Sequence, residues 1–457
     1  MDKKFDQTTI VNYLKNYGFV FASSEIYGGL ANAWDYGPLG VALKNNIKNL
    51  WWNYFITSQP NMVGLDSSII LNPAVWKASG HLANFADPLI DCKACHQRFR
   101  ADKLIEEKYP DIKINENTDK AQLLQIIKDK KIVCPNCGKA EWTDIRSFNL
   151  MFKTSQSVIE DKTNELYLRP ETAQGIFINF ANIQRALRLK VPFGVGQIGK
   201  AFRNEITPGN FIFRTREFEQ MEIEFFNYPK DAPAKFEEFL QMIQNFLFNV
   251  IKLKKENVRM AEHAKEDLSH YSARTIDFQY NFPHGWAELW GLANRTDFDL
   301  SNHQKLSGST LGYLDPETNE RFIPYVVEPS VGVERLFYAI ICDNYRVEPV
   351  KDGETREVLG LPYDLCPYKV AVLPLSNKLN ADAKKVFDNL ISKNVPAVFD
   401  ITGSIGKRYR RQDAIGTYYC ITYDFDSQKD NCVTIRNRDT MKQERIKISE
   451  ILKFLGK

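Results

Sequence analysis

The sequence predicts an α+β protein with an antiparallel-sheet body and a smaller, mixed α/β C-terminal domain. Two extended runs flank a turn signal at 208–210, so residues 202–226 predict a long antiparallel hairpin. Residues 346–365 are rich in proline, glycine and charge and have no periodicity, which is typical of a linker. At 457 residues the chain also exceeds a single hydrophobic core. We therefore expect a body at 1–345, a linker at 346–365 and a terminal domain at 366–457.

Composition excludes two broad classes. The chain is 44% hydrophobic and 26% charged, and no apolar run reaches membrane-spanning length. The first twenty residues lack the uninterrupted apolar stretch of a signal peptide. The eight cysteines form two CxxC pairs and four singles, which is not the pattern of a secreted disulfide framework. We expect a cytoplasmic protein that does not enter a membrane.

Helical spacing locates the other elements of the body. Residues 40–54 predict an amphipathic helix, and residues 101–131 a charged helical excursion within a cysteine-rich insertion at 86–145. A helical insertion is predicted at 227–273, and the sheet resumes at 274–280. The candidate core or interface positions of the first helix are Val41, Ile47, Leu50, Trp51 and Tyr54.

Strands alternating with helices predict the terminal domain. A helix at 379–391 lies among strands predicted at 369–375, 397–399, 418–423 and 432–435. A glycine-containing loop at 403–406 leads into the basic cluster Lys407, Arg408, Arg410 and Arg411. From residue 366 onward there are 17 Lys+Arg against 10 Asp+Glu, whereas the rest has 43 against 47. A basic unit on a slightly acidic body favours contact with a polyanion, and an incidental surplus on a solvated surface is the alternative.

The predicted hairpin carries charges suited to a ligand. Alternation places Arg203 and Glu205 beside small residues on the first run, and Glu222 and Glu224 together on the return run. Guanidinium groups grip oxyanions bidentately, and carboxylates attract amines. The hairpin therefore fits a ligand that carries both phosphate and amine. The alternative is a cross-strand ion-pair ladder on a solvated sheet.

The two CxxC pairs predict a structural zinc site. Cys92, Cys95, Cys134 and Cys137 can present four sulfurs to one tetrahedral ion if the intervening segment loops out. His96 is a candidate substitute ligand. Reduced structural thiols or a redox pair are the alternatives.

Four further charged residues are candidates for the site, and three of them have a second interpretation. Glu171 is either a buried ligand carboxylate or an acid favoured by a helix N-terminus. Arg335, in the first turn of a predicted helix, contacts either a ligand or an intrahelical acid. Arg100 is either a site residue or half of a surface ion pair, and Glu288 is a candidate metal-facing carboxylate.

Taken together, these motifs resemble those of the class II aminoacyl-tRNA synthetases, most closely the dimeric glycyl-tRNA synthetase family. Residues 32–52 resemble the first class II motif, 202–226 the second and 332–335 the third. LRPETAQG at 168–175 and FEQMEIEFF at 218–226 resemble glycine-specific members. The resemblance implies an antiparallel class II catalytic domain with helical and cysteine-rich insertions, followed by an anticodon-binding domain.

The family resemblance also implies roles for matching residues. The catalytic groups would be Arg203, Arg335 and Glu222. The ATP-binding residues would be Arg203, Asn204, Glu205, Phe213, Arg214, Thr215, Arg216, Glu217, Phe218, Glu288, Leu289, Gly332, Val333, Glu334 and Arg335. The glycine-binding residues would be Arg100, Glu171, Phe218, Glu219, Gln220, Met221, Glu222, Glu328, Pro329, Ser330, Val331 and Gly332.

The implied activity is that of a glycine–tRNA ligase. Glycine would react with ATP and Mg²⁺ to give glycyl-adenylate and pyrophosphate, and glycine would then pass to the 3′ end of tRNA(Gly), in a homodimer. Ala414 and Tyr418 stand where members usually carry Glu and Pro. A non-catalytic synthetase-like accessory or regulatory protein that binds nucleic acid is the alternative function, and another amino acid the alternative specificity. Retention of the arginines and acids disfavours the former, and the glycine-specific motifs disfavour the latter.

Overall fold

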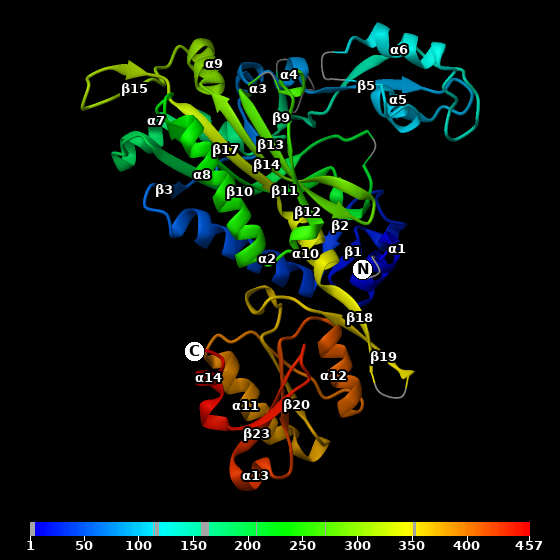
Figure 1. The fold of residues 1–457 in the computed structure, drawn as a ribbon, viewed down its shortest axis with the longest axis vertical. Helices are drawn as coiled ribbons and strands as arrows, with labels where there is room; N and C mark the ends of the chain where they lie inside the picture. The colour runs from blue at the N-terminus through cyan, green and yellow to red at the C-terminus, as the bar shows by residue number, and fades with distance from the viewer. Residues whose placement is uncertain are drawn as a thin grey trace.

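The computed structural model describes residues 5–112, 114, 118–156, 164–206, 208–269, 271–350 and 353–457. Figure 1 shows a central body, an insertion that projects from one upper corner, and a C-terminal unit below. The body is built around an antiparallel sheet, and the C-terminal unit mixes parallel and antiparallel strands. The predicted α+β class is therefore confirmed.

A seven-stranded sheet forms the centre of the body. All its neighbouring strands are antiparallel except at one edge, where β3 pairs in parallel with β10. In spatial order the strands are β12 (Val258–Glu262), β13 (Arg274–Phe282), β14 (Gly285–Thr296), β17 (Tyr325–Gly332), β11 (Glu217–Asn227), β10 (Phe193–Phe202) and β3 (Met62–Gly64).

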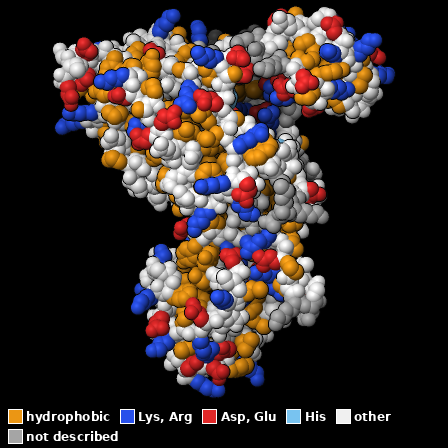
Figure 2. Space-filling view, viewed as in Figure 1, with side chains coloured by type: hydrophobic (Ala, Val, Ile, Leu, Met, Phe, Trp, Pro, Cys, Tyr) orange, Lys and Arg blue, Asp and Glu red, His pale blue; other side chains and the backbone are white. Residues whose placement is uncertain are grey.

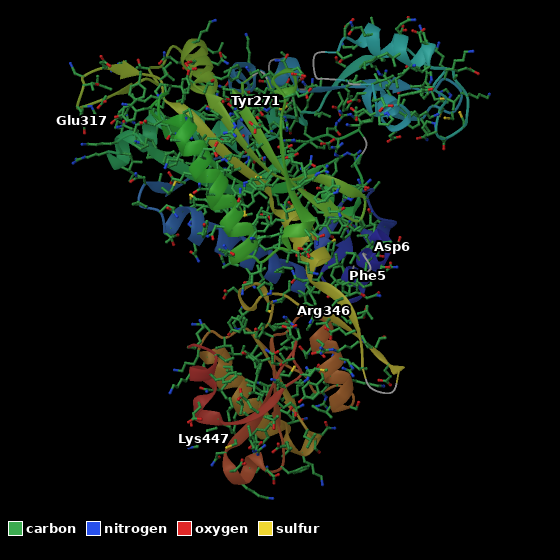
Figure 3. All side chains as sticks on the ribbon, in the orientation of Figure 1. Phe5, Asp6, Tyr271, Glu317, Arg346 and Lys447 are labelled. Carbon is green, nitrogen blue, oxygen red and sulfur yellow. The ribbon has the colours of Figure 1, made fainter. Side chains whose placement is uncertain are left out.

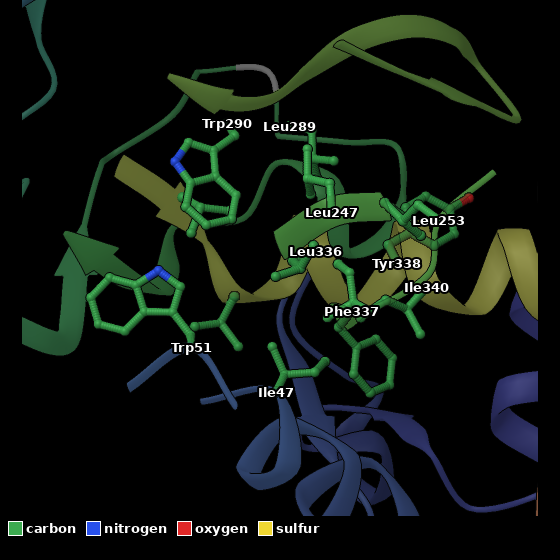
Figure 4. Close-up of a cluster of buried hydrophobic side chains, with 14 of the residues drawn as sticks. Ile47, Trp51, Leu247, Leu253, Leu289, Trp290, Leu336, Phe337, Tyr338 and Ile340 are labelled. Atoms are coloured by element: carbon green, nitrogen blue, oxygen red, sulfur yellow. The ribbon is translucent and has the colours of Figure 1, made fainter. Parts of the chain in front are cut away.

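Helices cover both faces of this sheet (Figure 1). One face packs on α2 (Pro38–Trp52), α8 (Ala232–Asn245) and α10 (Val333–Asn344), and Figure 4 shows part of that core around Trp51, Trp290 and Phe337. The other face packs on α7 (Ala173–Leu187) and α9 (Phe298–Ser307). The α2 helix begins at Pro38, whose missing N–H costs nothing in a first turn.

The predicted helix at 40–54 is confirmed with different ends, because a π-turn at Asn53–Thr57 follows α2. Its positions Ile47 and Trp51 are fully buried, whereas Val41 is exposed. Gly40 is required where it stands, because a Cβ there would overlap the carbonyl oxygen of Phe19. Burial of the Ile47 side chain contributes about 1.5–3 kcal/mol.

Shorter elements complete the body. They are α1 (Gln7–Asn16), β1 (Val20–Ala22), β2 (Trp34–Tyr36), β4 (Ile70–Leu71), α3 (Pro73–Ala78), α4 (His81–Asn84), β8 (Lys153–Ser155), β9 (Glu165–Leu168), β15 (Tyr313–Leu314) and β16 (Arg321–Phe322). Single 3₁₀ turns lie at Glu25–Tyr27, Phe211–Phe213, Lys255–Asn257 and Lys265–Asp267, and a second π-turn at Phe246–Val250.

The insertion has a small core of its own. Its strands are β5 (Ala86–Asp91), β6 (Arg98–Arg100) and β7 (Arg146–Asn149), and its helices are α5 (Ala101–Lys108) and α6 (Lys120–Asp129). Ile90, Leu104, Ile105 and Ile127 are buried against one another. The predicted helical excursion between the CxxC pairs is thus present.

The segment predicted as a linker contains regular structure. Strands β18 (Tyr345–Pro349) and β19 (Thr355–Leu359) pair as an antiparallel hairpin. Their charged residues interrupt the apolar pattern by which a strand is recognised in a sequence. Arg346 lies at this junction in Figure 3 and pairs with Asp439 at 2.7 Å. Arg356 is buried and pairs with Asp413 at 2.8 Å.

The C-terminal unit is a five-stranded sheet with helices. Its elements are β20 (Val370–Pro374), α11 (Asn380–Ser392), β21 (Ala397–Phe399), α12 (Ile405–Ala414), β22 (Tyr419–Tyr423), α13 (Ser427–Asp430), β23 (Cys432–Asn437), β24 (Gln443–Lys447) and α14 (Ile451–Phe454), with 3₁₀ turns at Tyr363–Leu365, Asn377–Leu379 and Ile448–Glu450. The β24 strand was absent from the sequence prediction. None of the described helices is long and apolar enough to cross a membrane.

The basic cluster is helical, and part of it faces inward. Ser404 caps α12, and Arg408 is buried, where it donates to the carbonyl oxygens of Pro374 and Gly403. Arg411 donates to Asp400. On the face seen in Figure 2, basic and acidic side chains of this unit are interspersed. These two arginines therefore stabilise the domain, and other basic side chains would have to contact a polyanion.

Candidate active site

The β10–β11 hairpin forms the floor of the candidate site. Its register pairs Gln197 with Glu222 and Phe202 with Glu217. The prediction that the first run extends through Arg203 and Glu205 to a turn at 208–210 is wrong, because β10 ends at Phe202. An irregular loop follows, with a 3₁₀ turn at Phe211–Phe213. The Arg203 N–H donates to the Arg216 carbonyl, and Gly209 and Arg214 form an isolated antiparallel bridge. The loop arches over the sheet and creates a pocket that a tight hairpin would lack.

That pocket gathers most of the residues predicted to hold ATP. Arg203 donates through Nε to the carbonyl oxygen of Pro170 and lies 5.4 Å from the centres of the Phe85 and Phe218 rings. Its pairing with aromatic rings fixes a cation at the pocket wall. The pocket is lined by Arg203, Glu205, Ile212, Phe213, Arg214, Thr215, Phe218, Gly332, Glu334 and Arg335.

Arg335 reaches this pocket from the start of α10. Its guanidinium lies 4.4 Å from the centre of the Phe213 ring, and Nη1 is 3.1 Å from a carboxylate oxygen of Glu288. The ion pair therefore joins α10 to β14 and is not intrahelical. Glu288 lies within β14, and its side chain is 50% exposed. Stacking and pairing hold the guanidinium flat, as recognition of a planar ring or a phosphate requires.

Glu222 lies on the opposite face of the sheet from the Trp51 core and is buried. Its carboxylate accepts hydrogen bonds from Thr172 Oγ1 at 2.5 Å and from Ser330 Oγ at 2.8 Å. Strand pairing of Glu222 with Ser330 puts the two side chains together. Burial and the neighbouring Glu171 raise the pKa of Glu222. A buried acid next to a second acid is stabilised by a bound cation.

Glu171 precedes α7 and belongs to the same cluster. Its carboxylate lies 3.3 Å from His81 Nε2 and accepts a hydrogen bond from Gln174 Nε2 at 2.9 Å. Burial opposes ionisation, but His81, its hydrogen bonds and Arg295 hold the pKa of Glu171 well below its usual range. Glu171 therefore remains a carboxylate at neutral pH. Both sequence interpretations apply, because the residue flanks a helix start and also faces the acid cluster.

Arg295 was missed by sequence reasoning and organises the far side of the cluster. It donates to Glu328 at 2.6 Å and makes two hydrogen bonds to Asp299. Its guanidinium lies 4.0 Å from the centre of the Tyr271 ring, which Figure 3 labels above the sheet. His81 and Thr172 were also missed. His81 lies far along the chain from its partner Glu171, and Thr172 lies far from its partner Glu222. The sequence around each residue therefore gave no signal of the contact, although Thr172 directly follows the predicted Glu171.

Some predicted residues lie on the other face of the sheet. Met221, Leu289 and Val331 are buried in the core that packs on α2 and α10, so only their backbone can border the site. Glu219 alternates with Gln220 on β11, as the two-residue period of a strand requires, and binds Lys44 of α2 at 2.6 Å. Glu334, in the first turn of α10, lines the pocket of Arg203 and binds the same lysine at 2.7 Å. Lys44 thereby ties the first predicted motif to the other two.

Two further predicted residues, Glu217 and Arg100, lie away from the acid cluster. Glu217 pairs with Lys200 at 2.7 Å, and both side chains are exposed, so part of the ion-pair-ladder alternative is present at this end of the hairpin. Arg100 pairs with Asp87 and Asp102 at 3.1 and 2.6 Å. Within the described chain, no hydrogen bond or ion pair joins Arg100 to Glu171 or Glu222.

The four predicted cysteines converge in the insertion. Cys92 Sγ lies 3.6 Å from Cys137 Sγ, and Cys95 Sγ lies 3.7 Å from Cys134 Sγ. Sulfurs at 2.3 Å from a tetrahedral zinc ion lie about 3.8 Å apart. The four sulfurs lie within 4.8 Å of one another, and His96 is outside the group. The donor set and its spacing fit zinc.

Comparison with known sequences identifies the family. Residues 152–345 match the class II tRNA synthetase core domain (G, H, P, S and T), residues 369–457 an anticodon binding domain, and two overlapping segments, 87–122 and 112–150, the glycyl-tRNA synthetase insertion domain 1. A glycine–tRNA ligase from Malacoplasma penetrans is 63% identical over 99% of this chain and 97% of its own. The chain belongs to the glycine–tRNA ligase family.

Two other family members give the same picture. The Mycoplasmoides gallisepticum ligase is 60% identical over 100% of this chain and 99% of its own, and that of Geobacillus kaustophilus is 56% identical over 98% and 97%. The fold is also similar to that of prolyl-tRNA synthetase from Cryptosporidium parvum, crystallised with L-proline and AMP. That structure has a TM-score of 0.63 at 12% identity and covers 99% of this chain and 76% of that one. The family and the class II fold expected from the sequence are thus confirmed.

Proposed function

We propose that this chain activates glycine with ATP and transfers it to tRNA(Gly), with the residue roles set out below. It is an aminoacyl-tRNA-forming ligase of class II. The observation that carries the residue assignment is the buried Glu222, whose carboxylate accepts hydrogen bonds from Thr172 and Ser330. Glu222 lies on the hairpin that leads into the Arg203 pocket. An acid cluster beside an arginine-lined pocket fits an ammonium next to a phosphate.

The arginine-lined pocket would hold ATP. Arg203 would contact the α-phosphate, and the Phe213 ring with the Arg335 guanidinium stacked on it would border the adenine ring. The exposed carboxylate of Glu288 and that of Glu205 could face the Mg²⁺ ion that accompanies ATP, and this ion would neutralise phosphate charge. The glycine carboxylate is already a nucleophile, so catalysis needs positioning and charge neutralisation and no general base.

The acid cluster would hold the glycine ammonium. Glu171 and Glu222 would pair with it, and Ser330 would orient Glu222 through its hydrogen bond. Glycine is the smallest amino acid, so a pocket closed around its α-carbon rejects every other by overlap. Gln220 borders this cluster, because its side-chain oxygen accepts from the Thr172 N–H at 3.2 Å.

Partners are proposed from separate features. The anticodon-binding domain, divided from the body at residues 346–365, would contact tRNA(Gly). A homodimer is supported by a surface segment in which Ile26 and Tyr27 are 88% and 87% exposed and Leu30 is 64% exposed. The four-cysteine group would hold a structural zinc ion, which would crosslink the two ends of the insertion. A cytoplasmic location stays a prediction.

Amino-acid-dependent ATP–pyrophosphate exchange tests the activation step. Purified protein would be supplied with Mg²⁺ and with glycine, alanine, serine, threonine or proline separately. We expect exchange with glycine alone. Exchange with another amino acid would contradict the proposed pocket, and folded protein that exchanges with none would favour a non-catalytic role. Charging of tRNA(Gly) transcripts then tests the second step.

A further inference from the structure

One buried acid beside the proposed glycine pocket has no role in the mechanism above. Glu224 lies two residues after Glu222 on β11, on the same face, and its side chain is fully buried. On one side its strand partner is Val195, which offers no polar group. On the other side, the register that pairs Glu222 with Ser330 and Phe225 with Val327 sets Glu224 opposite Glu328.

No cation accompanies Glu224 in the described part of the chain. Neither of its carboxyl oxygens receives a hydrogen bond from a described donor, whereas Glu328 accepts from Arg295 Nη1 at 2.6 Å. Oxygen atoms of Glu222, Glu224 and Glu328 lie within 4.8 Å of one another. Arg295 is shared, because Asp299 takes two more of its hydrogen bonds. The cluster therefore contains more carboxyl groups than its cations can balance.

We propose that Glu224 is a neutral carboxylic acid that donates its proton in a hydrogen bond to Glu328 and so positions Glu328 at the edge of the amino-acid pocket. Two facing carboxylates in a buried site cannot both stay ionised, and the one without a cation takes the proton. Burial and then Glu328 raise the pKa of Glu224 well above its usual value. Burial also raises the pKa of Glu328, to about 7, but Arg295 favours the charged form of Glu328.

This arrangement gives the two acids of β11 different tasks. Glu222 receives two hydroxyl donors and would act on the ammonium as a charge. Glu224 would touch no substrate and act through Glu328 as a donor. A neutral Glu224 also removes one negative charge from the pocket, so the ammonium of glycine can balance the remaining negative charge of the other carboxylates. The inference rests on the proposed function, since it assigns a positioning residue to the same site.

Two substitutions separate the donor from the charge. E224Q keeps the shape and an N–H donor and is always neutral, whereas E224L is similar in size and cannot donate. In glycine-dependent ATP–pyrophosphate exchange, we expect E224Q to keep the glycine KM within about 3-fold of wild type. We expect E224L to raise it at least 10-fold with a smaller change in the ATP KM. E222Q serves as the reference for loss of a pocket charge.

An infrared difference spectrum between wild type and E224Q supplies a readout that does not depend on activity. A protonated Glu224 gives a carboxylic-acid carbonyl band at neutral pH that E224Q lacks. Absence of that band, an E224Q defect as large as that of E222Q, or an E224L enzyme within 3-fold of wild type would overturn the inference. If E224L fails to fold, the spectrum and E224Q still decide. Wild-type enzyme without glycine-dependent exchange would instead count against the proposed function.

Discussion

Replacing Arg335 by alanine tests the proposed nucleotide pocket. The guanidinium stacks on Phe213 at 4.4 Å and pairs with Glu288 at 3.1 Å, and its side chain is only 24% exposed. A charge-assisted hydrogen bond contributes about 1.5–3 kcal/mol and a cation–π contact about 0.5–2 kcal/mol, and the two contributions are not independent. We therefore expect R335A to lose about 2–4 kcal/mol of transition-state binding, which is about 30- to 1,000-fold in kcat/KM for ATP.

Steady-state ATP–pyrophosphate exchange at saturating glycine measures this loss. R335K keeps the charge without the planar fork, so we expect an intermediate loss. Lys200 offers a matched control, because it pairs with Glu217 on the same hairpin at an exposed position, and K200A should change kcat/KM less than 3-fold. If folded R335A retained its kcat/KM for ATP within 3-fold, the assignment of Arg335 to the nucleotide would be refuted.

Three further predictions follow from buried or clustered groups. The glycine KM should rise as the pH falls below neutrality, because Glu222 must be ionised to bind the ammonium and its pKa is raised. This pH dependence should vanish in E222Q. A wild-type KM that does not change with pH would contradict the prediction. Metal analysis should find one zinc ion per chain, lost in C95S together with about 2–4 °C or more of Tm; metal-free protein of unchanged Tm would exclude a structural ion. D413N should lower the free energy of unfolding of the C-terminal unit by about 3–5 kcal/mol in urea titrations, because it breaks a buried network with Arg356 and Arg436; a loss under 1 kcal/mol would falsify this account.

Alternation explains what the sequence could predict of the site. A strand has a strict two-residue period, so grouping Glu222 with Glu224 and separating them from Met221 needed no tertiary information. The zinc ligands were equally accessible, because each CxxC turn brings two sulfurs together by itself. The class II fold followed from long motifs in a fixed order. These features depend on residues that are close in the chain.

Features that depend on distant residues were not predictable. Arg295 on β14 reaches Glu328 on the neighbouring strand β17, and His81 reaches Glu171 from a four-residue helix. The end of β10 at Phe202 also escaped prediction, because the apolar and polar pattern continues past the point where pairing stops. Arg408 looked like a surface cation by composition, yet three backbone hydrogen bonds compensate for its burial.

The hairpin of β18 and β19 fixes the distance between the body and the C-terminal unit. Glu357 on β19 accepts hydrogen bonds from Tyr17 and Tyr345 at 2.7 Å each, while Arg356 beside it is locked to Asp413 in the C-terminal unit. Adjacent residues of one strand, with side chains directed to opposite sides, thus clamp both halves of the molecule. The distance between the body and the C-terminal unit is therefore fixed before a nucleic acid that contacts both of them binds. Removing the contacts of Glu357 or of Arg356 would let that distance vary while each half stays folded.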